Sequence, residues 1–194
     1  ISVSPGSTTS YSVVYATGGC TSPASALATV TVNSVPTANA GTTTTLTCAA
    51  PTATLSGSGG GSYAWSGPSI TGGGTTANPT VNAAGTYSLA VTSPQGCTSA
   101  VSTVAISQNT TAPVPTASNS TTLTCAVSTV ALTGGPASGV TYQWSGPGFS
   151  GGTTSQNAVA TAAGTYTLKV TDAVNGCTAT AVTTVAQNTT APSP

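Results

Sequence analysis

The sequence almost lacks charge. Its 194 residues include one lysine, Lys169, and one acidic residue, Asp172, with no arginine, glutamate or histidine. Charged side chains usually make up about a quarter of a globular chain, whereas here they make up 1%. A basic patch is therefore missing. Its absence removes the main attractive force for nucleic acid and for anionic lipid surfaces, so we expect neither as a partner.

The shortage of titratable groups also restricts catalysis and metal binding. General acid–base catalysis needs a titratable group suited to proton transfer, and zinc needs clustered cysteine and histidine. Lys169 and Asp172 lie close together in sequence, and alternation along a strand places them on opposite faces. We interpret them as solvated surface residues. An internal crosslink between Lys169 and an asparagine would need a nearby acid to assist it, and the sequence offers no obvious one. We expect no enzyme, no cofactor and no metal site.

Two glycine-rich matches carry little chemistry. Residues 146–151 fit GxGxxG and residues 148–152 fit GxSxG. The dinucleotide motif needs a following helix, which Pro147 and the run of glycines do not favour. The serine motif needs a base, and the chain has no histidine. We interpret residues 146–152 as a loop between strands.

Long apolar runs and methionine are missing too. No stretch approaches the roughly twenty apolar residues of a membrane-spanning helix, so none is predicted. The chain begins at Ile1 and contains no methionine, so we expect a mature form, a processed piece or a window of a longer protein. Residues with hydroxyl side chains take the place of the missing charged residues: the chain contains 43 Thr and 26 Ser. Abundant Val and Thr with spaced aromatics favour ordered β-structure over a low-complexity stalk.

A repeat organises the sequence. Four anchors each occur twice at a nearly constant spacing: Cys48 and Cys125, Trp65 and Trp144, Tyr87 and Tyr166, Cys97 and Cys177. Cys20 precedes Cys97 by the same interval, with little matching sequence ahead of it. The pattern predicts two whole repeats, 36–113 and 114–194, preceded by the C-terminal half of a third at 1–35. The connectors are short and carry proline, which favours a rod-like array.

Within a repeat the apolar period is two. Tyr87, Leu89 and Val91 alternate with small or polar residues, as do Tyr166 and its neighbours. This pattern predicts half-buried strands. Many short strands separated by turns, without a helical pattern, predict an all-β fold of tandem β-sandwich domains.

These residues resemble a known group. The succession of T-L-x-C, Y-A-W-S-G, A-A-G-T-Y-S-L-x-V and G-C is similar to the PKD-like and immunoglobulin-like repeats of large bacterial surface proteins. It especially resembles adhesins that the type IX secretion system exports in gliding bacteria. The resemblance implies an Ig-like or PKD-like sandwich and a cell-surface location, and it transfers no active site.

Two departures limit the resemblance. Trp65 is followed by Ser-Gly-Pro-Ser-Ile, where PKD domains usually carry an acidic, glycine-rich stretch. Leu89 and Leu168 occupy the place where antibody-type domains carry their second cysteine.

The tyrosine after Ala-Gly-Thr resembles the tyrosine corner. We assign four aromatics to the cores rather than to sugar-stacking platforms: Trp65, Tyr87, Trp144 and Tyr166.

Five cysteines at repeat spacing suit disulfides and an oxidising, extracellular location. We expect one bond within each repeat, Cys48–Cys97 and Cys125–Cys177, with the partner of Cys20 outside this chain. Each bond closes a loop of about fifty residues, worth about 4 kcal/mol. Periodicity alone also allows Cys20–Cys48 and Cys97–Cys125, across the connectors.

Three hypotheses for function follow. The first is a structural and adhesive repeat region, the stalk of an extracellular surface adhesin, whose partners are neighbouring repeats and an unidentified surface ligand. The second is a filament subunit, in which another copy completes residues 1–35 by adding strands. The third is a carbohydrate-binding module, which would need aromatics on an exposed face.

Overall fold

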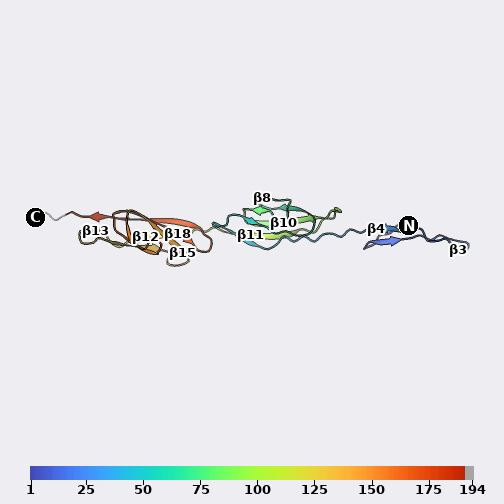
Figure 1. Ribbon diagram of the computed structural model, residues 1–194, viewed down its shortest axis with the longest axis horizontal. Helices are drawn as coiled ribbons and strands as arrows, with labels where there is room; N and C mark the ends of the chain where they lie inside the picture. Colours follow the sequence, from blue (N-terminus) through green and yellow to red (C-terminus); the bar gives the residue numbers. More distant parts are fainter. Residues whose placement is uncertain (191–194) are drawn as a thin grey trace. The chain divides into compact units, whose positions relative to one another are not determined.

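The computed structural model describes residues 1–190, and every regular element in that range is a β-strand (Figure 1). The predicted all-β fold is therefore confirmed. Residues 1–190 contain no helix that could span a lipid bilayer.

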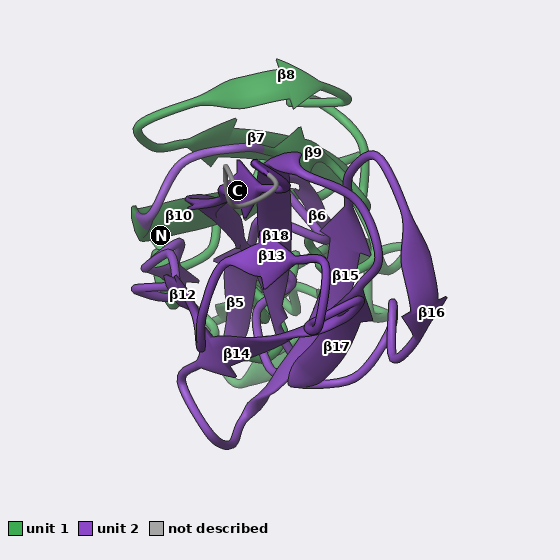
Figure 2. Cartoon of the chain, turned by 90° about the vertical axis from the view of Figure 1, so that its left-hand side faces the viewer, with its two compact units in different colours: residues 1–43, 54–81, 85–105 green, residues 44–53, 82–84, 106–194 purple. Residues whose placement is uncertain are grey.

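The chain forms two compact units (Figure 2). Unit 1 contains residues 1–43, 54–81 and 85–105, and unit 2 contains residues 44–53, 82–84 and 106–194. This division departs from the sequence repeats most clearly at the segment 44–53. That segment joins unit 2 because β5 (Thr44–Thr47) pairs in parallel with Ile106–Asn109, the second half of β11 (Ser102–Asn109).

Unit 2 contains two sheets packed face to face. One has the strand order β12-β14-β17-β16 and the other β15-β18-β19. Their bounds are β12 Thr116–Asn119, β14 Val130–Gly135, β15 Val140–Ser145, β16 Phe149–Gly151, β17 Asn157–Ala160, β18 Gly164–Asp172 and β19 Thr178–Val185. A parallel pair, β13 (Leu123–Thr124) with β20 (Gln187–Asn188), lies outside these sheets. One apolar core takes buried side chains from both sheets, which makes the unit an immunoglobulin-like β-sandwich.

Strand alternation builds that core. In β18, Tyr166, Leu168 and Val170 are fully buried, while Lys169 is exposed on the opposite face. Leu168 lies opposite Trp144 of β15 in the antiparallel register. The period of two predicted for this segment is therefore confirmed, and burial of these large apolar groups is the main force that stabilises the unit.

The tyrosine corner is formed as the resemblance implies. The hydroxyl of Tyr166 lies within hydrogen-bond distance of the carbonyl oxygens of Gly148 and Ala162, at 2.8 and 2.7 Å. Its ring packs so closely on Gly146 that a Cβ there would lie 2.4 Å from a ring carbon. The indole nitrogen of Trp144 donates to the carbonyl of Ser155 at 3.2 Å, so both aromatics are buried with their polar atoms satisfied.

Unit 1 repeats this construction. Its larger sheets are built from strands with these bounds: β6 Ala53–Thr54, β7 Ser62–Ser66, β8 Ile70–Gly72, β9 Thr80–Val81, β10 Gly85–Thr92 and the first half of β11. Trp65 and Tyr87 are buried. The Tyr87 hydroxyl donates to the Ser69 carbonyl at 3.1 Å, the same corner as in unit 2.

Residues 1–35 form two small hairpins within unit 1. β1 (Thr9–Tyr11) pairs with β4 (Ala28–Val30), and β2 (Ala16–Thr17) pairs with β3 (Cys20–Thr21). Side chains that match core positions of the whole repeats are uncovered here. Val13 is 59% exposed and Tyr15 69%, whereas their counterparts Leu89 and Val91 are fully buried.

Candidate functional site

The two turns that present Cys48 and Cys177 form the most elaborate polar site in the described part of the chain. Both lie in unit 2. Cys48 follows β5, and its turn is closed by Thr47: the Thr47 amide donates to the Ala50 carbonyl at 2.9 Å, and the Ala50 amide donates to the Thr47 hydroxyl at 3.0 Å. A threonine that bonds its own backbone in this way fixes a turn locally.

The second turn spans residues 172–177. The Asp172 amide donates to the Cys177 carbonyl at 2.8 Å. One carboxylate oxygen of Asp172 accepts from the amides of Val174 and Asn175, at 2.8 and 2.9 Å, an Asx-type turn. Gly176 adopts a φ of +70°, which glycine tolerates without strain. The one acidic side chain in the sequence therefore organises a turn.

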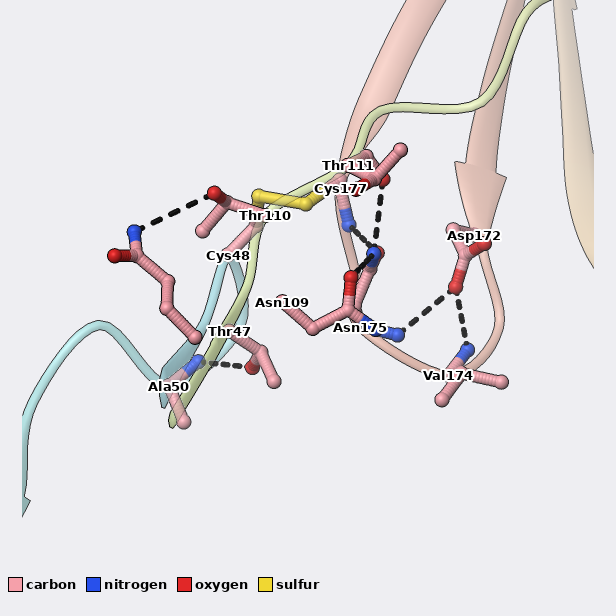
Figure 3. The surroundings of a disulfide bond; sticks show 11 residues. Thr47, Cys48, Ala50, Asn109, Thr110, Thr111, Asp172, Val174, Asn175 and Cys177 are labelled. Carbon is pink, nitrogen blue, oxygen red and sulfur yellow. Dashed lines mark hydrogen bonds between the residues drawn. A yellow bond between two sulfur atoms is a disulfide. The ribbon is translucent and has the colours of Figure 1, made fainter. Parts of the chain in front are cut away.

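Asn175 links the two turns to the connector that runs between the repeats (Figure 3). Its side chain is 2% exposed. The amide nitrogen donates to the Asn109 side-chain oxygen at 3.0 Å and to the Thr111 carbonyl at 2.9 Å. Its side-chain oxygen accepts from the Cys177 amide at 2.8 Å. Every hydrogen of this buried amide group is satisfied, as a stable buried polar group requires.

A disulfide joins these turns. It connects Cys48 to Cys177, with 4.9 Å between the Cα atoms and a sequence separation of 129. The Ala49 amide also donates to the Asn175 carbonyl at 3.1 Å, so backbone hydrogen bonding accompanies the covalent bond. Closing a loop of this length removes unfolded-state entropy worth about 5 kcal/mol. The bond ties the first whole sequence repeat to the second across their connector.

The expected pairs within each repeat, Cys48–Cys97 and Cys125–Cys177, are therefore wrong. Parallel pairing is the reason. β5 runs alongside the end of β11, so Cys48 lies where β11 finishes, whereas Cys97 precedes the start of β11 at Ser102. The length of that strand separates its two ends by on the order of 25 Å, far beyond the reach of a disulfide.

The alternative across the connectors is not formed either. It paired Cys20 with Cys48 and Cys97 with Cys125. In the structure Cys20, Cys97 and Cys125 are all free thiols. The bond does cross a connector, as that alternative proposed, but it joins the first cysteine of one repeat to the second cysteine of the next.

Asn175 is the site residue that sequence reasoning missed. The residues Val-Asn-Gly before Cys177 marked a turn, and the matching position in the first whole repeat is Gln95. Nothing in the spacing indicated that this amide would be buried against Asn109. The one feature of the sequence that could have drawn attention to Asn175 is its place directly before a glycine and a cysteine.

The other candidate residues are structural. Trp65, Tyr87, Trp144 and Tyr166 are between 0 and 8% exposed, so they present no platform for a sugar. Residues 146–152 contain β16 and connect strands, with no helix after them in the described range. Among the described residues, no group of three or more histidine, cysteine or acidic side chains is placed to hold a metal ion.

When the chain is compared with known proteins, only solved structures are found to be similar to it. No protein-family model matches the chain, and no curated protein matches it. Among solved structures, the chain is similar to extracellular domains 3–5 of Drosophila OTK at 17% identity, covering 86% of this chain and 66% of that one, with a TM-score of 0.35. Murine CEACAM1b is 14% identical, with 79% and 100% covered and a TM-score of 0.37.

A third example is the I9–I11 tandem of titin, 12% identical, with 80% of this chain and 65% of that chain covered and a TM-score of 0.38. The chain thus spans about two thirds of the OTK and titin chains. The sandwich fold follows from the paired sheets and the apolar core of unit 2.

Proposed function

We propose that the chain is a structural repeat region in the stalk of an extracellular surface adhesin. The observation that carries this proposal is the Cys48–Cys177 disulfide, which crosses the connector between two sequence repeats. Disulfides persist in oxidising compartments outside the cytosol. A bond at this place resists separation of consecutive repeats, which is the mechanical requirement of a stalk.

The connector itself supports the same role. Asn175 holds Asn109 and Thr111 through two hydrogen bonds from a buried amide. Force applied at the two ends of the chain passes from Cys48 to Cys177 through the disulfide, so it does not extend the connector while that bond is intact. The loop that the bond closes, across a sequence separation of 129, therefore carries no load.

The surface chemistry suits repeats in series. With one lysine and one aspartate in 194 residues, like repeats do not repel one another. Exposed threonine and serine side chains keep the surface hydrated. Contacts made by such a surface depend little on salt, because screening acts on charges.

We further propose the class of surface protein to which these repeats belong. The sequence similarity to PKD-like and Ig-like repeats supports a bacterial cell-surface protein, and within that group an adhesin exported by type IX secretion. Trp65 and Trp144 in their strands and the Gly-Thr-Tyr segments at Tyr87 and Tyr166 support it.

Labelling of intact cells tests the location and the role. An antibody raised against residues 36–190 is applied to unpermeabilised source cells, and attachment to glass is compared with cells in which the coding segment is deleted in frame. The proposal is supported if the antibody labels intact cells and if cells with the deletion attach to glass more weakly or for a shorter time. Labelling only after permeabilisation, or unchanged attachment, contradicts it.

A filament subunit is the second candidate, and one observation favours it. Residues 1–35 expose apolar side chains at positions that are buried in the whole repeats, and Val3, Tyr11, Val13 and Val30 help to line an apolar hollow there. Strands from another copy would cover this surface. Concentration-dependent fibres of the purified chain in electron micrographs support this candidate, and a monomer at all concentrations contradicts it.

A further inference from the structure

Three free cysteines occupy the same repeat positions as the two bonded ones, and two of them, Cys97 and Cys125, lie in the whole repeats. Cys125 is the counterpart of Cys48 in the next repeat, and Cys97 is the counterpart of Cys177 in the preceding one. Both Cys97 and Cys125 are unpaired thiols. Each is therefore one half of the arrangement that the Cys48–Cys177 bond completes.

The turn at Cys125 reproduces the turn at Cys48. The Thr124 amide donates to the Val127 carbonyl at 2.9 Å, and the Val127 amide donates to the Thr124 hydroxyl at 3.0 Å. The corresponding distances at Thr47 and Ala50 are 2.9 and 3.0 Å. The strand before Cys125, β13, also pairs in parallel, as β5 does.

The turn at Cys97 reproduces the turn at Cys177. The Ser93 amide donates to the Cys97 carbonyl and the Gly96 amide to the Ser93 carbonyl, each at 2.9 Å. The equivalent bonds of Asp172, Gly176 and Cys177 measure 2.8 and 3.0 Å. Gly96 and Gly176 both have positive φ, +83° and +70°.

Each free thiol also faces a connector. The Cys97 sulfur lies 3.9 Å from the carbonyl oxygen of Asn33, and the Cys125 sulfur lies 3.9 Å from that of Thr189. At the bonded site, the connector residue Thr111 accepts a hydrogen bond from Asn175, two residues before Cys177 (Figure 3). Both half-sites thus already hold the connector that a completed junction contains.

We propose that Cys97 and Cys125 each form a disulfide with another repeat of the same polypeptide, so that every repeat is bonded to the next. By the observed spacing, the partner of Cys97 lies about 129 residues upstream and follows a Leu-Thr pair. The partner of Cys125 lies about 129 residues downstream and follows a glycine. This proposal rests on the proposed stalk function, since it needs further repeats in tandem.

A repeat in the same polypeptide fits better than a second copy. The observed junction contains one connector, Asn109–Thr111, which Asn175 holds between the two turns. If Cys125 of one copy were bonded to Cys97 of another, the junction would have to accommodate two connectors, the one at Thr189 and the one at Asn33. The observed junction accommodates one.

The bond formation is an ordinary thiol–disulfide exchange. The thiol pair loses two protons and two electrons as its S–S bond forms. A disulfide donor, either an oxidoreductase disulfide or a small-molecule disulfide, is cleaved to two thiols and takes them up. No other co-reactant is required.

Disulfide mapping of the natural polypeptide tests the proposal. The protein is purified with free thiols blocked by iodoacetamide, then digested without reduction. Thermolysin replaces trypsin, because Lys169 is the sole tryptic site in these 194 residues. We expect the Cys97 peptide bonded to a Leu-Thr-Cys peptide and the Cys125 peptide bonded to a Gly-Cys peptide, each from another repeat, with Cys48–Cys177 as the internal standard.

Three outcomes overturn the proposal. They are an iodoacetamide adduct on Cys97 or Cys125, a bond between these two cysteines, and a ladder of chain multimers on a non-reducing gel that collapses on reduction. The ladder would assign the partner to a second copy. Failure here leaves the stalk function testable, because surface labelling of cells does not depend on the state of these thiols.

Discussion

Removing the Cys48–Cys177 bond is expected to destabilise the sandwich of unit 2 strongly. In the double variant Cys48→Ser/Cys177→Ser, the unfolded chain regains the freedom that a closed loop of 129 residues denies it. The chain-entropy relation values that freedom at about 5 kcal/mol, and it still gives about 4 kcal/mol for a loop of half the length. This is a large part of the roughly 5–15 kcal/mol that stabilises a typical domain.

Guanidinium unfolding followed by tryptophan fluorescence measures the effect, since Trp144 lies in the core of unit 2. The matched control is Cys97→Ser/Cys125→Ser, which removes two cysteines that are unpaired in this chain. We expect a clear fall in the unfolding midpoint for the first variant and none for the control. Equal midpoints, or a fall in the control alone, would refute the assignment of the bond.

Three further predictions concern the corner, the glycine beneath it and the surface. Tyr166→Phe removes the hydroxyl contact to the Ala162 carbonyl and leaves the Gly148 carbonyl only its bond from the Thr161 amide, so it is expected to lower the free energy of unfolding by about 1–3 kcal/mol, measured by denaturant titration. Gly146→Ala places a Cβ 2.4 Å from the Tyr166 ring and is expected to destabilise by about 1–3 kcal/mol, while Gly151→Ala, with nothing within 4 Å, stays near the parent in the same thermal melt. Self-association of the chain, followed by light scattering, is expected to change little between about 0.05 and 1 M salt, and a steep decline would show that charge governs its contacts.

The local patterns of the sequence predicted the fold. Alternation around Tyr87 and Tyr166 placed these residues and their neighbours in the core. The glycine directly after Trp-Ser recurs in both repeats, where the ring of the corner tyrosine packs against it. These features depend on residues close in sequence or on one face of a strand, so period and turn chemistry suffice to find them.

The disulfide could not be predicted in the same way. Repeat spacing gives the positions of Cys48 and Cys177 but not the direction in which a short edge strand runs. The parallel pairing of β5 with β11 decides which end of the sandwich Cys48 occupies. That pairing brings Thr44 beside Ile106, far along the chain, and strands as short as β5 and β13 carry too little pattern to reveal it. The burial of Asn175 depends on the same junction.

The most direct test of the account is the length of chain that the disulfide holds back under force. The whole chain is held by its ends in optical tweezers and unfolded before and after reduction. The Cys48–Cys177 bond hides 129 residues, so reduction is expected to release roughly 430–460 Å of additional contour length. An unchanged contour length, or a gain matching the two smaller loops of the pairs Cys48–Cys97 and Cys125–Cys177, would contradict the claim that the bond ties one repeat to the next.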